Sequence, residues 1–208
     1  MAQRAPSLPA HPDPAATRST SLDALMEKGS ERPFRELIYS LMSLSNLMRS
    51  NQEHFAAYIG VTVPQYTMMA VLNDAGRASV GEIAARLEVS SQFVTLEVRK
   101  LLEKGLVEKQ PNQADRRSVL LELTPTGQAL MRELAPLRRE TNDLMFRTLS
   151  AEQIAQLRAI FGTLLRDGRN ALHQLEAPHR REQRAPTLET LGKPAKRKAA
   201  AKPRGSAR

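Results

Sequence analysis

Two groups of polar side chains in the middle of the chain have the types and the spacing to bind an anionic polymer. The first group lies on a segment with helical periodicity and consists of Ser91, Gln92, Thr95, Arg99 and Lys100. The second is the run Asp115, Arg116 and Arg117, which lies between two short apolar runs. Hydroxyl, amide and guanidinium groups hydrogen-bond to phosphates and base edges. The predicted chemistry is recognition rather than reaction.

Catalytic, metal and cofactor sites have little support in the sequence. The spacing of the four histidines suggests no metal ligands; they are His11, His54, His173 and His179. The chain has no cysteine, which excludes disulfides, thiolate zinc sites and cysteine redox sensing. It also has no glycine-rich phosphate loop and no nucleophile motif. We therefore predict neither an enzyme nor a cofactor-binding protein.

The first polar group must be held by an amphipathic helix. One buried stripe on that helix is formed by Val94, Val98, Leu101 and Leu102. Ser90 or Ser91 is expected to cap the helix, and Gly105 to end it. A short helix over residues 79–87, capped by Ser79, precedes it. Two helices joined by so short a turn predict a helix-turn-helix.

The second polar group must be held by a β-hairpin. Apolar side chains alternate along two short runs, at Val107, Val119, Leu121 and Leu123. The residues from 110 to 118 are polar, charged or turn-forming. An amphipathic helix followed by a hairpin with arginine at its tip predicts a winged helix, in which the helix is shaped for the DNA major groove. A solvated hairpin tip without a partner is the alternative reading.

Long helices are predicted on both sides of this domain. The first extends over about residues 33–58 and carries Leu37, Leu41, Leu44, Leu47 and Met48 at helical spacing. Gly60 and Pro64 follow, and Pro64 is expected to open a second helix. Helical periodicity resumes over residues 125–175, with a bend at Pro136 and a capping box from Ser150 to Gln153. The fold class is therefore mainly α.

The apolar faces of the first and last helices are too large for a winged domain of about 75 residues to cover. An apolar stripe without a partner in its own chain indicates association between chains. We therefore predict a homodimer, whose paired wings match a two-fold DNA site.

The basic charge of the chain belongs to its C-terminal end. The net charge is +9, and residues 177–208 hold ten lysines or arginines against two glutamates, so residues 31–176 retain only +1. Residues 1–30 have the composition of a disordered tail, and residues 177–208 that of a basic disordered tail. The basic tail either attracts DNA without reading sequence or serves only solubility.

No apolar run is long enough to span a bilayer and no signal peptide is present, so we expect a cytoplasmic protein with no membrane partner.

Residues 33–175 resemble the MarR regulators of bacteria. Five motifs carry the resemblance: VPQY at 63–66, SVGEIA at 79–84, LEKGLVEK at 102–109, DRR at 115–117 and LTPTG at 123–127. The resemblance implies a MarR-type domain over 31–176, with a winged helix-turn-helix at about 62–124 between dimerisation helices at about 33–58 and 125–175. It also implies a transcriptional regulator of double-stranded DNA, often a repressor released by a small aromatic or lipophilic molecule.

The resemblance assigns roles to the polar residues. In the family the wing-tip arginine enters the minor groove and an aspartate two residues earlier steadies it, here Arg117 and Asp115. Ser91, Gln92 and Thr95 are placed to meet base edges and phosphates, and Arg99 and Lys100 to meet phosphates. The chain departs from the family at two positions. Leu96 stands where a basic residue is common, and Glu97 where an apolar residue is common.

As in the family, an effector pocket is expected between the first long helix, the second helix that Pro64 opens and the DNA-binding lobe. Six residues there mix apolar bodies with polar tips, as a ligand site needs: Tyr39, Arg49, His54, Tyr58, Tyr66 and Met69. The alternative is that each packs in the core or at the dimer interface. For the whole chain, the alternative to a sequence-specific regulator is a nonspecific architectural DNA binder that depends on the basic tail.

Overall fold

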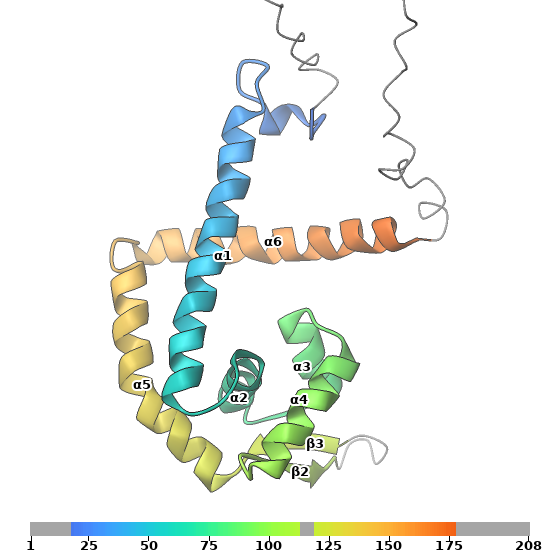
Figure 1. Cartoon of the computed structure of the whole chain (residues 1–208). Helices are drawn as coiled ribbons and strands as arrows, with labels where there is room; N and C mark the ends of the chain where they lie inside the picture. Colours follow the sequence, from blue (N-terminus) through green and yellow to red (C-terminus); the bar gives the residue numbers. More distant parts are fainter. Residues whose placement is uncertain (1–17, 113–118, 178–208) are drawn as a thin grey trace, which may run out of the picture. The chain divides into compact units, whose positions relative to one another are not determined.

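The structure is a computed structural model that describes residues 18–112 and 119–177. The chain divides into two units, residues 1–147 and 148–208, which are described separately. As predicted, the fold is mainly helical, with one small sheet (Figure 1).

The first unit contains the predicted helices and hairpin strands in the expected order, together with a short 3-10 helix and a short first strand that were not predicted. Its elements are η1 (Asp23–Leu25), α1 (Arg32–Tyr58), α2 (Val63–Ala75), β1 (Arg77–Ser79), α3 (Val80–Leu87), α4 (Ser91–Glu103), β2 (Val107–Pro111), β3 (Val119–Leu123) and α5 (Pro125–Phe146). The second unit contains α6 (Ala151–Glu176). α5 continues as one helix through Pro136, and Figure 1 shows it changing direction along its length.

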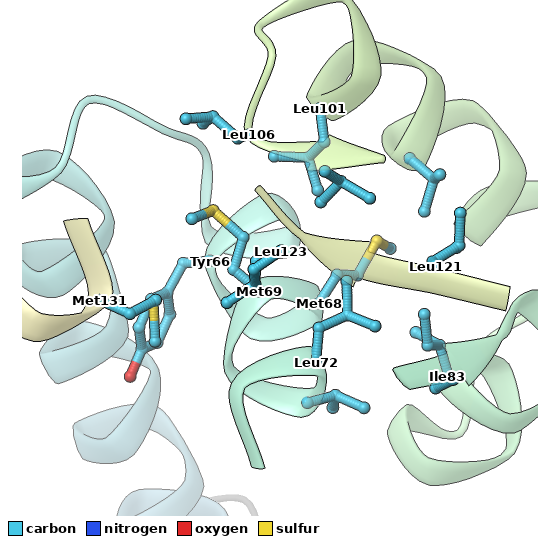
Figure 2. Close-up of a cluster of buried hydrophobic side chains, with 14 of the residues drawn as sticks. Tyr66, Met68, Met69, Leu72, Ile83, Leu101, Leu106, Leu121, Leu123 and Met131 are labelled. Carbon is cyan, nitrogen blue, oxygen red and sulfur yellow. The ribbon is translucent and has the colours of Figure 1, made fainter. Parts of the chain in front are cut away.

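The core of the first unit surrounds α2, which contacts α1, α3, α4, α5 and the sheet. Figure 2 shows Ile83 of α3, Leu101 of α4, Leu121 of β3 and Met131 of α5 in the same cluster as Met68, Met69 and Leu72 of α2. The largest side chains with almost no exposed surface are Met68, Met69, Leu72, Ile83, Val94, Leu101, Leu121 and Leu134. Burying one such side chain contributes about 1.5–3 kcal/mol to stability. The core therefore joins α4 and the β2–β3 hairpin to α2.

Local signals set the start of most helices. Ser79 and Ser150 form the predicted caps, each in a capping box, with Glu82 and Gln153 respectively. Ser90 caps α4, and its Oγ accepts a hydrogen bond from the backbone N–H of Phe93 at 3.2 Å. α2 begins one residue earlier than expected because Thr62 forms a further capping box with Gln65.

The sheet has three antiparallel strands in the order β1-β3-β2. The hairpin of β2 and β3 was predicted, whereas β1 was not. Its three residues pair with β3, with Ala78 opposite Leu121. Gly76 makes the turn into β1 with a φ of +74°, which glycine adopts without strain.

The predicted disorder of residues 1–30 needs correction for the residues that the structure describes. Residues 18–30 contain η1 and a bridge between Glu27 and Ser30. The backbone N–H of Ser19 donates to Oε2 of Glu31 at 2.8 Å, and its hydroxyl donates to the same oxygen at 3.1 Å. These hydrogen bonds hold Ser19 against the residue before α1, which the composition of the segment did not indicate. The rest of this tail, residues 1–17, lies outside the described residues.

Much apolar surface remains uncovered on the long helices. On α1 the exposed side chains include Leu37, Tyr39, Met42, Leu47 and Tyr58, and on α6 they include Ile160, Phe161, Leu164, Leu172 and Leu175. Within the described part of the chain, no single helix is both long and apolar enough to cross a membrane. α1 and α2 meet that criterion only as a pair, bent by 87°.

Candidate nucleic-acid interface

The recognition helix α4 is anchored along one side. Val94, Val98 and Leu101 are buried, as the stripe predicted, and Leu102 is partly buried. α4 contacts α2, α3 and β2. After α4, Gly105 adopts a φ of +65° and turns the chain toward the wing. The opposite side of α4 is left facing solvent.

All five predicted DNA-contacting residues of α4 are exposed: Ser91, Gln92, Thr95, Arg99 and Lys100. Three of them have partners within the helix. The Thr95 hydroxyl donates to the Ser91 carbonyl at 2.8 Å, Arg99 Nε lies 3.1 Å from Glu103 Oε1, and Lys100 Nζ lies 2.6 Å from Glu97 Oε1. An exposed ion pair is worth only about 0–1 kcal/mol, so a phosphate can replace the carboxylate of Glu103.

Leu96 was not among the predicted contacts, yet it lies on the same solvent-facing side. Its side chain is 54% exposed. It follows Gln92 by four positions and precedes Arg99 by three, and residues at these spacings share one helix face. This spacing was the signal that could have identified it.

Glu97 belongs to the buried side of α4, in agreement with its place at a commonly apolar position. Only 7% of it is exposed, and its Oε2 accepts from Gln65 Nε2 at 3.1 Å. Gln65 Oε1 accepts in turn from Lys104 Nζ at 3.2 Å. These contacts join the start of α2 to the recognition helix at two places, Glu97 in its middle and Lys104 at its C-terminal end.

Polar side chains from all three strands contact one another at the base of the wing. Arg77 Nε of β1 lies 2.5 Å from Glu122 Oε2 of β3, and Gln110 Nε2 of β2 donates to Glu122 Oε1 at 2.6 Å. The Arg77 guanidinium is the main cause that lowers the pKa of Glu122 below its usual value. The predicted wing-tip residues Asp115, Arg116 and Arg117 lie outside the described residues.

A second set of contacts ties the wing to the recognition helix. Leu106, directly after the turn that ends α4, accepts at its carbonyl from the Thr124 N–H at 3.1 Å. The Thr124 hydroxyl donates to the Gly105 carbonyl at 2.7 Å and accepts from the Gly127 N–H at 3.1 Å. The LTPTG segment therefore joins the exit of the wing, the turn after α4 and the start of α5.

The six residues expected around an effector do not form one site in this chain. Tyr39, Arg49, His54 and Tyr58 are exposed on α1, and Arg49 pairs with Glu53 at 2.8 Å. Tyr66 and Met69 are buried, and the Tyr66 ring meets the Phe55 ring edge-on with centroids 5.8 Å apart. Four hollows formed by the described residues have other linings. The core-packing alternative therefore describes Tyr66 and Met69 in the isolated chain.

The comparisons with known proteins agree with this architecture. The MarR family model matches residues 59–118. The chain is 27% identical over 136 residues to the multiple antibiotic resistance protein MarR of Salmonella typhimurium, a match that covers 64% of this chain and 91% of that protein. It is 29% identical over 129 residues to the transcriptional repressor MdtR of Bacillus subtilis, covering 62% of this chain and 83% of MdtR.

A solved structure shows the same fold at greater sequence distance. NadR in complex with 4-hydroxyphenylacetate aligns with a TM-score of 0.57 and 19% identity, covering 67% of this chain and 95% of NadR. The family and these relatives are regulators rather than enzymes. With its helix-turn-helix, its three-stranded sheet and its family match over residues 59–118, the chain is a winged-helix protein similar to the MarR transcriptional regulators.

Proposed function

We propose that the chain is a homodimeric repressor that binds a pseudo-palindromic operator in double-stranded DNA. The observation that supports this proposal most directly is the exposed polar side of α4 beside the wing. On that side Ser91, Gln92 and Arg99 face solvent, while buried contacts fix the opposite side. A rigid helix with exposed hydrogen-bonding groups suits the major groove, where each base pair presents a distinct pattern. MdtR is named a repressor, which supports the same direction of regulation here.

Dimerisation is supported by the uncovered apolar surface of the long helices. α1 and α6 each expose several large apolar side chains, and α6 has no buried residue. Such surface is costly to leave in water, and a second copy with the same faces covers it. Sedimentation of the full chain tests this directly. A monomer at micromolar concentration would contradict it.

We further propose that a small aromatic or lipophilic molecule, often an anion, releases the DNA. NadR is described in complex with 4-hydroxyphenylacetate, an aromatic acid, which supports this class of ligand. In a dimer, exposed Tyr39, Tyr58, His54 and Arg49 are available to line a site that the single chain lacks. Linkage requires that a ligand weakening DNA binding by a coupling of about 1–3 kcal/mol prefers the DNA-free dimer by the same factor.

The effector proposal is tested by a DNA-release screen with aromatic acids and phenols. Peroxide serves as a control because the chain has no cysteine through which thiol oxidation could act. We expect release by an organic ligand and none by peroxide. Release by peroxide alone would exclude a pocket of this kind.

The function itself is tested by selecting duplexes from random DNA with the full chain, followed by footprinting upstream of its own gene. We expect a two-fold site, with half-sites about one helical turn apart, bound at least about 1,000-fold more tightly than competitor DNA. The alternative is a nonspecific architectural binder that depends on the basic tail. Equal affinity for all duplexes, with the same steep salt dependence, would favour that alternative.

A further inference from the structure

The exposed side of the recognition helix has an apolar centre. Leu96 is 54% exposed, and its neighbours on the same side, Gln92, Thr95 and Arg99, are polar. Residues four apart on a helix lie one above the other, so Leu96 stands one turn after Gln92. A leucine in the middle of a hydrogen-bonding surface therefore faces outward from α4.

Leu96 has no role in the core of the first unit. The buried side of α4 is formed by Val94, Glu97, Val98 and Leu101. Its exposure instead leaves apolar surface at the part of α4 that the proposed function brings closest to DNA. Apolar surface removed from water contributes about 25 cal/mol per Å², but only where the partner surface is also apolar.

The major groove of B-DNA presents one apolar group, the C5-methyl of thymine. We propose that Leu96 packs against a thymine methyl in each half-site and so determines specificity at that base pair. The inference rests on the proposed operator binding and names the base that this site reads.

The position of Leu96 also constrains the half-site. One helical turn advances about 5.4 Å, and successive base pairs rise about 3.4 Å. Gln92 suits a bidentate contact to adenine, so the adenine facing Gln92 and the thymine facing Leu96 should lie within about two base pairs of each other. A half-site read this way is rich in A·T pairs next to α4.

The test replaces each thymine of the selected operator, one at a time, with deoxyuridine, which lacks only the methyl group. Dissociation constants are measured for the wild-type chain and for Leu96→Ala on each duplex. Alanine has the highest helix propensity, so a loss of affinity in this variant does not come from a weaker helix. For the wild type we expect one thymine per half-site at which deoxyuridine weakens binding about three- to tenfold.

In Leu96→Ala the same replacement should have no effect, which is the coupling that a double-mutant cycle isolates. Leu22→Ala is the matched control, because Leu22 is 63% exposed but lies outside α4, and it should keep the full thymine preference. A thymine preference that persists in Leu96→Ala would overturn the inference, as would a selected half-site with no methyl-sensitive thymine. Failure to select any sequence would instead reject the proposed operator binding, and the inference with it.

Discussion

The side-chain amide Nε2 of Gln65 lies 3.1 Å from Oε2 of Glu97, which joins the first turn of α2 to the recognition helix. Both residues are buried, at 2% and 7% exposure. Lys100 donates to the other Glu97 oxygen at 2.6 Å. A buried carboxylate is tolerated only when it is paired and hydrogen-bonded, and both oxygens here have a donor. The contact therefore fixes how α4 is turned relative to the central helix.

Glu97→Ala should destabilise the fold by about 1–3 kcal/mol, because it leaves the buried Gln65 amide without its acceptor. Glu103→Ala removes an exposed carboxylate from the same helix, which pairs with exposed Arg99, and should cost less than about 0.5 kcal/mol. The free energies of unfolding in urea compare the two variants. Equal stabilities would show that the buried contact contributes nothing.

Gly127→Ala should be strongly destabilising, because a Cβ at this position would stand 2.2 Å from the Leu106 carbonyl oxygen. Backbone would have to move at the turn that follows the recognition helix, and we expect a cost of more than about 2 kcal/mol. Gly81→Ala is the matched control, since its nearest neighbour, Ser79 Oγ, would be 3.9 Å away. The control should be neutral or more stable by up to about 1 kcal/mol. Similar thermal midpoints for both variants would contradict the close approach.

Glu82 should contribute a pH-dependent part of the stability of α3. The Ser79 backbone N–H, 2.7 Å from Glu82 Oε2, is the main cause that lowers the pKa of this carboxyl below 4.5. Because the folded pKa lies below the unfolded one, the contribution is complete above about pH 4.5 and is lost as pH falls through the folded pKa.

Glu82→Gln keeps a side chain suited to the capping box but cannot titrate. The stability difference between wild type and this variant, measured by urea denaturation from pH 7 to pH 3, should therefore change in favour of the variant as pH falls. A constant difference would show that this carboxyl does not act through its charge.

The sequence predicted α3, α4 and the wing hairpin because their signals are local. Ser79 with Glu82, and Val94 with Val98, lie within one or two turns of each other. β1 was missed because its three residues exist as a strand only through pairing with β3, more than 40 residues later. Leu96 and Glu97 are neighbours on α4, yet Leu96 is exposed and Glu97 is buried. Tertiary contacts with α2 determine which of them faces inward.

The effector site was the least predictable part. The resemblance grouped Tyr66 and Met69 with Tyr39 and Tyr58 because the family's site lies between the first helix, the second helix and the DNA-binding lobe. In the structure α2 turns its side chains into the core, whereas the middle of α1 faces solvent. A site completed by a second copy is not determined by the periodicity of one chain.

Arg117→Ala should weaken operator binding by roughly 1–3 kcal/mol and leave the fold and the dimer intact, because the sequence predicts Arg117 outside the apolar positions that build the core. Arg139→Ala, which removes the same charge from an exposed position on α5, is the control and should have little effect on operator affinity. Fluorescence anisotropy with the selected duplex measures both. An unchanged affinity for Arg117→Ala would remove this residue from the interface.

Deletion of residues 178–208 should keep dimerisation and sequence preference but reduce the salt dependence of DNA binding. α6 ends at Glu176 with Ala177 as its C-cap, so the deletion leaves the described helix complete. The removed segment holds ten basic residues against two glutamates. Each phosphate that these residues neutralise adds about 0.9 to the magnitude of the slope of log K against log salt. The deletion should therefore lower that magnitude by about the same amount for each such phosphate.

Titrations of the operator and of an unrelated duplex at several salt concentrations give both slopes. An unchanged slope on both duplexes would mean that the tail does not touch DNA, and loss of the dimer would place part of the dimer interface beyond α6.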